Sequence, residues 1–123
     1  MTIALIALVA VGILYFIVSS KGGSGSPVKS VSPMEAKQLL SDKSVIALDV
    51  RTPAEVKAGK IKGAKALNVT SMNFAKGLEE LDKSKKYVVY CRSGKRSLKA
   101  CQIMASKGFE DVVNMNGGYM AWK

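Results

Sequence analysis

The stretch of sequence that decides the fold spans residues 87 to 97 and reads Tyr87-Val88-Val89-Tyr90-Cys91-Arg92-Ser93-Gly94-Lys95-Arg96-Ser97. Its first four residues are β-branched or aromatic, which predicts a central strand. A polar loop containing a glycine follows, and then apolar residues recur at helical spacing. The segment is therefore a βα unit that delivers Cys91 to the carboxyl end of a strand, where open α/β sheets place their ligand sites.

Similar units surround this one. Two segments of the same form, Ser32-Pro33-Met34-Glu35 and Thr52-Pro53-Ala54-Glu55, are capping boxes with proline at the first helical position, and each predicts the start of a helix. Further strands are predicted at residues 45–48, 66–69 and 112–113. Further helices are predicted from apolar residues at helical spacing, namely Phe74, Leu78 and Leu81, then Leu98, Cys101 and Met104, the latter helix ending at Gly108. The fold class is α/β, with a mainly parallel sheet of four or five short strands flanked by helices.

The amino-terminal residues predict a different environment. Ile3 to Val18 is apolar except for Gly12, and the run through Ser20 would form a helix about 27 Å long, close to the ~30 Å hydrocarbon thickness of a bilayer. We expect a transmembrane anchor at 1–20, a flexible Gly/Ser linker at 21–27 and one domain at 28–123. A cleaved signal peptide is the alternative. Lys21 and Lys29 follow the apolar run and no basic residue precedes it, so a single-pass cell-membrane protein with a cytoplasmic domain is predicted.

Composition restricts the chemistry. The 123 residues contain no histidine and two cysteines, which excludes Ser-His-Asp and Cys-His catalysis and an ordinary structural zinc site. No cofactor and no metal are expected. The net charge is +10, but the lysines are scattered and no nucleic-acid-binding motif accompanies them, so nucleic acid is not an expected partner.

The loop after Cys91 has the features that activate a thiol. Backbone N–H groups between a strand and a helix form an anion-binding nest, Gly94 permits the tight turn, and Arg92, Lys95 and Arg96 add positive charge. These conditions lower the pKa of a cysteine and favour the nucleophilic thiolate. The alternative is a buried structural cysteine. For Cys101, core packing is the leading interpretation and a resolving thiol the alternative.

Several motifs in this order resemble a single-domain rhodanese, a thiosulfate:cyanide-type sulfurtransferase. They cover most of the chain from about residue 31 to 122. They are Asp49-Val50-Arg51 with Glu55, Gly59-Lys60-Ile61-Lys62-Gly63-Ala64 with Asn68, the Cys91 loop, and Gly117-Gly118 with Trp122. The family's usual His and Pro in the second motif are Lys60 and Lys62 here. The loop is C-x4-R, shorter than the C-x5-R loop of related phosphatases.

The resemblance implies that Cys91 accepts a sulfane sulfur from a small anionic donor such as thiosulfate, forms a persulfide and passes the sulfur to a thiol or cyanide; a protein acceptor is also possible. Substrate would bind at Arg92, Ser93, Gly94, Lys95, Arg96 and Ser97, while Asp49, Arg51 and Glu55 would form an ion-pair and capping group. Trp122 would plug the core. Two alternatives stay open, a non-enzymatic adaptor or sensor at the membrane, and a phosphatase or arsenate reductase.

Overall fold

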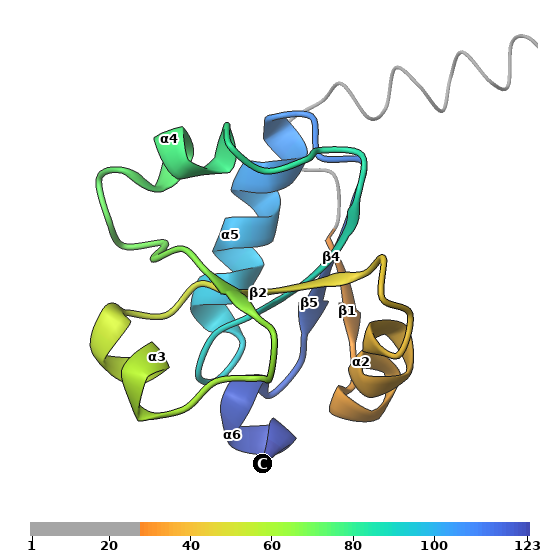
Figure 1. Ribbon diagram of the computed structural model, residues 1–123. Helices are drawn as coiled ribbons and strands as arrows, with labels where there is room; N and C mark the ends of the chain where they lie inside the picture. The colour runs from red at the N-terminus through yellow and green to blue at the C-terminus, as the bar shows by residue number, and fades with distance from the viewer. Residues whose placement is uncertain (1–27) are drawn as a thin grey trace, which may run out of the picture.

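The computed structural model describes residues 28–123, which form a five-stranded sheet with helices on both faces (Figure 1). The strands lie in the order β1-β5-β4-β2-β3, and every neighbouring pair is parallel. The strands are β1 (Lys29–Val31), β2 (Ile46–Asp49), β3 (Lys65–Ala66), β4 (Lys86–Tyr90) and β5 (Asp111–Met115). The helices are α2 (Pro33–Leu40), α3 (Pro53–Ala58), α4 (Phe74–Leu78), α5 (Lys95–Ser106) and α6 (Gly118–Trp122).

The two capping boxes predicted from sequence are both present. Ser32 accepts the backbone N–H of Glu35 at the start of α2, and Thr52 accepts that of Glu55 at the start of α3. In each case the glutamate returns a hydrogen bond to the backbone of the capping residue. These caps satisfy N–H groups that the first helical turn leaves without partners, and they fix where each helix begins.

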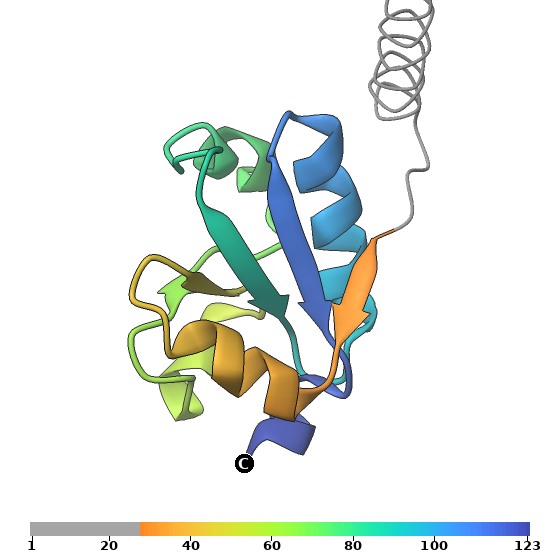
Figure 2. The same ribbon diagram turned by 90° about the vertical axis from the view of Figure 1, so that its right-hand side faces the viewer.

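The central strand β4 divides the core into two layers. Tyr87 and Val89 face one apolar cluster, which α4 and α5 cover, and Val88 and Tyr90 face a second cluster, which α2 and α6 cover. Successive side chains of a strand point to opposite faces, so an uninterrupted apolar strand is the pattern expected when both faces are buried. The strands point toward α6, which lies at their carboxyl ends (Figure 2).

Some boundaries and faces differ from the sequence prediction. The strand expected at 66–69 is only Lys65–Ala66, although the N–H groups of Leu67 and Val69 still bond to the carbonyls of Asp49 and Val50. Leu98 is 37% exposed rather than buried. The buried face of α5 instead begins at Ser97 and continues through Ala100, Cys101 and Met104. A search for apolar residues alone missed the polar first member of this stripe. Trp122 is only partly buried, with the Lys37 ammonium 5.1 Å from its ring centre.

The predicted anchor at 1–20 and linker at 21–27 lie outside the described residues. Between residues 28 and 123, no helix is long and apolar enough to cross a membrane.

Candidate functional site

Cys91 lies immediately after β4 and is buried, with 1% of its surface exposed. Its sulfur accepts a hydrogen bond from the Gly94 N–H at 3.1 Å, and the Ser97 hydroxyl oxygen lies 3.3 Å away. The chain therefore turns back on itself within three residues, so that loop amides face the sulfur. This is the anion-binding arrangement expected from the sequence.

These contacts change the acidity of the thiol. Burial is the largest single influence and raises the pKa of Cys91, because a charged sulfur loses solvation. Hydrogen bonds from the Ser97 side chain and from the backbone of Ser97, Gly94 and Ser93 act in the opposite direction, and together they leave the pKa below its ordinary value. The thiolate is the nucleophilic form of cysteine, so the loop favours reactivity without any imidazole.

Helix α6 holds the loop from the other side. The N–H of Tyr119 donates to the Cys91 carbonyl at 2.8 Å, and the N–H of Met120 donates to the Arg92 carbonyl at 3.1 Å. Gly118 makes this approach possible, because a Cβ at that position would lie 2.4 Å from the Arg92 carbonyl oxygen. The Gly117-Gly118 motif is thus required by the backbone-to-backbone packing of α6 on the Cys91 loop.

The loop cations have different surroundings. Arg92 and Lys95 are exposed, as is Ser93. Arg96 instead forms a two-pronged ion pair with Glu55, with nitrogen–oxygen distances of 2.7 and 2.9 Å. Arg96 lowers the pKa of Glu55 to about 2, an effect that burial opposes and the bonds to Thr52 reinforce. Glu55 had been expected to join Asp49 and Arg51, but its hydrogen-bonded partner is Arg96.

Asp49 and Arg51 form a separate buried pair. The Arg51 guanidinium donates to both carboxylate oxygens of Asp49, at 2.9 and 2.7 Å, and to the Gly59 carbonyl at 2.5 Å. It also lies 4.4 Å from the ring centre of Tyr119, a cation–π contact. This pair therefore ties the end of β2 to the segment after α3 and to α6, as a structural group.

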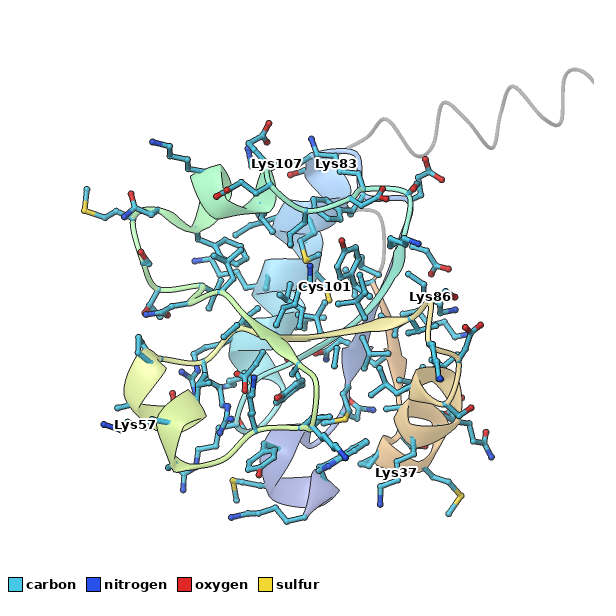
Figure 3. The ribbon with its side chains drawn as sticks, in the orientation of Figure 1. Lys37, Lys57, Lys83, Lys86, Cys101 and Lys107 are labelled. Atoms are coloured by element: carbon cyan, nitrogen blue, oxygen red, sulfur yellow. The ribbon has the colours of Figure 1, made fainter. Side chains whose placement is uncertain are left out.

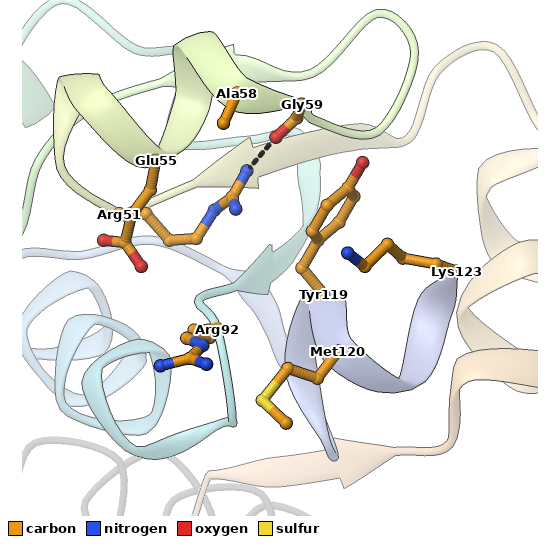
Figure 4. Close-up of a pocket in the computed structure, with 8 residues that line it drawn as sticks. All are labelled: Arg51, Glu55, Ala58, Gly59, Arg92, Tyr119, Met120 and Lys123. Carbon is orange, nitrogen blue, oxygen red and sulfur yellow. Dashed lines mark hydrogen bonds between the residues drawn. The ribbon is translucent and has the colours of Figure 1, made fainter.

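A cavity of about 430 Å³ opens beside the loop (Figure 4). Arg92, the residue next to Cys91, forms part of its wall, and Arg51, Tyr119 and Lys123 form others. The complete lining is Arg51, Glu55, Ala58, Gly59, Arg92, Tyr119, Met120 and Lys123. Of the basic side chains here, Arg92 and Lys123 have no carboxylate partner among the described residues. Sequence reasoning missed the α6 residues, because only the fold brings them beside the loop.

A second residue that the sequence did not reveal is Asn114 on β5. It is 3% exposed, and its Oδ1 lies 2.5 Å from the Ser97 hydroxyl. Cys101, by contrast, behaves as expected for a core residue. It lies on the inner face of α5 (Figure 3), is fully buried, and burial followed by the nearby charge of Cys91 raises its pKa to about 12.

Comparison with known proteins identifies the family. The sequence profile of the Rhodanese-like domain matches residues 32–123. The chain belongs to the rhodanese-like family. It is 35% identical over 96 residues to a sulfurtransferase of Allochromatium vinosum, covering 77% of this chain and 88% of the relative. A putative sulfurtransferase of Bacillus subtilis is 36% identical over 97 residues, covering 78% and 91%.

Solved structures agree with this assignment. A rhodanese-like domain protein from Staphylococcus aureus superposes with a TM-score of 0.71 at 33% identity, covering 78% of this chain and 92% of that protein. A human single-domain sulfurtransferase superposes with a TM-score of 0.68 at 28% identity, covering 80% and 96%. The rhodanese fold predicted from sequence is confirmed.

We predict that Gly118→Ala disrupts the rhodanese loop much more than Gly108→Ala. Both glycines have positive φ angles, +60° and +95°, so alanine strains the backbone at either position. Only Gly118 faces the loop carbonyls, whereas a Cβ at Gly108 meets nothing within 4 Å. Urea unfolding should show a loss of about 1 kcal/mol for Gly108→Ala and at least twice that for Gly118→Ala. Equal losses would contradict the packing role.

We also predict that the Glu55–Arg96 ion pair stabilises the domain in a pH-dependent way. Because the folded pKa of Glu55 is about 2 and its ordinary value is 4.5, the stabilisation is complete above pH 5 and disappears as the pH falls toward 2. Glu55→Gln should cost about 1–2 kcal/mol at pH 7, allowing for solvent screening of two side chains about 30% exposed, and much less near pH 3.

Glu35→Gln is the matched control for this experiment, since Glu35 occupies the same capping-box position on α2 and forms no ion pair among the described residues. Its cost, measured by the same urea unfolding, should be small at every pH. If the two variants lose equal stability at pH 7, the ion pair contributes nothing.

Proposed function

We propose that this protein is a rhodanese-type sulfurtransferase in which Cys91 carries the transferred sulfur as a persulfide. The observation that carries the proposal is the hydrogen bonding of the Cys91 sulfur by the loop, together with its lowered pKa. Relatives named as sulfurtransferases support it, including a thiosulfate sulfurtransferase of Pseudoalteromonas translucida, 33% identical over 95 residues.

The first step is attack by the Cys91 thiolate on the outer sulfur of a thiosulfate-like donor. The sulfur–sulfur bond of the donor breaks, its electron pair leaves with sulfite, and Cys91 becomes a persulfide with a negative terminal sulfur. The N–H groups of the nest and the positive end of α5 favour this anion. No general base is needed, because the attacking group is already ionised.

In the second step an acceptor nucleophile attacks the terminal sulfur, and the Cys91 thiolate is the leaving group. Cyanide yields thiocyanate, and a thiolate yields a new persulfide. The cavity beside the loop has room for an acceptor larger than thiosulfate, at about 430 Å³. Arg92 and Lys123 give it a positive character that suits an anionic donor or an acidic acceptor.

The position of Arg96 favours sulfur transfer over phosphoryl transfer. A phosphatase loop needs cationic donors directed at three phosphoryl oxygens, which carry charge in the transition state. Here both terminal nitrogens of Arg96 are bonded to Glu55, and the loop is C-x4-R. Arg96 therefore acts in this proposal by fixing α3 against α5, and the exposed Arg92 and Lys95 attract the donor.

We predict that thiocyanate formation from thiosulfate and cyanide depends on Cys91. Cys91→Ser should abolish it, because a serine hydroxyl is not ionised at neutral pH and forms no persulfide. Cys101→Ala is the matched control and should keep most of the activity. Arg92→Ala should raise KM for thiosulfate several-fold through the lost charge, whereas Lys107→Ala, at the far end of α5, should not.

The persistence of thiocyanate formation in Cys91→Ser would exclude the persulfide mechanism. Inactive native protein whose Cys91 also resists iodoacetamide at neutral pH would favour the adaptor or sensor. Release of phosphate from a small aryl phosphate would favour a phosphatase.

We further propose that residues 1–20 anchor the sulfurtransferase domain in the cell membrane and that residues 21–27 link the two. The apolar run from Ile3 to Val18 supports the anchor, and Lys21 and Lys29 support a cytoplasmic domain. Lysines on several sides of the domain suit a position beside anionic lipid (Figure 3).

We predict that the full chain sediments with membranes and resists extraction by alkaline carbonate, as an apolar helix of this length should. A Ser26→Cys variant should react with a membrane-impermeant maleimide only after the cells are lysed. Release of a shortened chain into the soluble fraction would instead indicate a cleaved signal peptide, and labelling in intact cells would reverse the orientation.

A further inference from the structure

The buried amide of Asn114 lies behind the Cys91 loop and has no assigned role in sulfur transfer. Asn114 is on β5, opposite Val89 of β4 and Ser30 of β1, and is 3% exposed. Its Nδ2 lies 3.3 Å from the Ser30 hydroxyl and 3.4 Å from the Gly94 carbonyl, and its Oδ1 lies 2.5 Å from the Ser97 hydroxyl. One side chain thus contacts the outer strand, the loop and the first turn of α5.

The neighbours of Asn114 fix the direction of each hydrogen bond. The Gly94 carbonyl is an acceptor only, so the amide atom that faces it must be the NH₂ group. The other amide atom is therefore the carbonyl oxygen, which must receive its proton from Ser97. Ser97 is fully buried and has a single hydroxyl proton. It cannot donate that proton to Asn114 and to the Cys91 sulfur at the same time.

We propose that Asn114 is a positioning residue that competes with the Cys91 sulfur for the hydroxyl proton of Ser97 and so limits the share of cysteine present as thiolate. While Cys91 is a thiol, Ser97 donates to Asn114, the shorter contact, and the S–H group can donate to the Ser97 oxygen. When Cys91 ionises, its proton passes to solvent and the Ser97 hydroxyl turns toward the sulfur. Ser97 and Asn114 exchange a hydrogen bond and neither gains nor loses a proton.

The competition has a cost that falls on the ionised form. When Ser97 turns to the thiolate, the buried Asn114 oxygen loses its donor, which is unfavourable. Asn114 therefore keeps Cys91 less acidic than its loop alone would make it. A thiolate of higher pKa is also the stronger nucleophile and the poorer leaving group, so this residue adjusts the balance between forming and discharging a persulfide.

Other charged groups near Cys91 also set its acidity and stay unchanged in the test. Arg96 and Cys101 on α5 are both coupled electrostatically to Cys91, Arg96 being paired with Glu55 and Cys101 having a pKa of about 12. The acidic residue of β5, Asp111, is paired with Lys86 at the opposite end of the strand. The remaining titratable groups around the loop are Arg92, Lys95, the Asp49–Arg51 pair at the end of β2, Tyr90 and Tyr119.

The test is the rate of Cys91 alkylation by iodoacetamide as a function of pH, followed by mass spectrometry on the full chain. Asn114→Leu has a similar shape and no acceptor, so it should shift the midpoint about 0.5–1 pH unit lower, giving roughly 3–10-fold more thiolate below the midpoint. Asn114→Asp adds a stronger, charged acceptor and should shift the midpoint higher. Opposite shifts are not expected from a merely structural residue.

Ser97→Ala should raise the midpoint, and in that background Asn114→Leu should cause no further decrease. Ser30→Ala is the matched control, because it removes a contact of Asn114 but leaves the Ser97 bond, and its midpoint should stay at the native value. If Asn114→Leu fails to fold by circular dichroism, Asn114→Ala serves in its place with the same expected direction.

A native or raised midpoint in Asn114→Leu, or an equal decrease with and without Ser97, would overturn the inference. The inference rests on the proposed role of Cys91 as the nucleophile, but alkylation requires no sulfur transfer. The expected shifts without persulfide formation would leave the inference standing and count against the function alone. Normal persulfide formation without the shifts would overturn the inference alone.

Discussion

The hydrogen bonds around the Cys91 sulfur are the constraint on which the rest of the site depends. A thiolate buried to 1% exposure is costly unless donors replace the lost water. The Gly94 N–H and the Ser97 hydroxyl supply such donors, and they reach the sulfur only because the chain turns tightly at Gly94, whose φ is +110°. Much of the surrounding architecture maintains that turn.

Two further parts of the fold hold the loop in place. Helix α6 donates backbone N–H groups to the carbonyls of Cys91 and Arg92, and Gly118 allows the close approach. Glu55 extends from the capped start of α3 to Arg96 on α5, which connects the second βα unit to the first turn after the loop. The charges nearest the loop are thus divided between structural pairs and the exposed Arg92 and Lys95 that remain for substrate.

The sequence predicted those features that depend on local rules. Capping boxes, the apolar strand β4 and the glycine after α5 each involve residues within a few positions of one another, and the structure confirmed them. The Cys91 loop is also local, so its nest was predictable. The partner of Arg96 was not, because Glu55 lies 41 residues away and an equally plausible set of acids and bases was nearer in sequence.

Asn114 and Ser97 were missed or undervalued for a related reason. A polar residue in a short strand gives no periodic signal, and a serine at the start of a helix is ordinarily exposed. Only the parallel pairing of β5 with β4 and β1 brings Asn114 behind the loop, where it contacts α5. Leu98 shows the same limit, since an apolar residue suggested the buried face while Ser97 actually begins it.

The central claim is that the Cys91 sulfur accepts and holds a second sulfur atom. Its most direct measurement is the intact mass of the native protein after incubation with thiosulfate, followed by mapping of the modified peptide. The account predicts a gain of one sulfur atom, located on Cys91, and its loss on addition of cyanide. An unchanged mass, or an added sulfur found on Cys101, would contradict it.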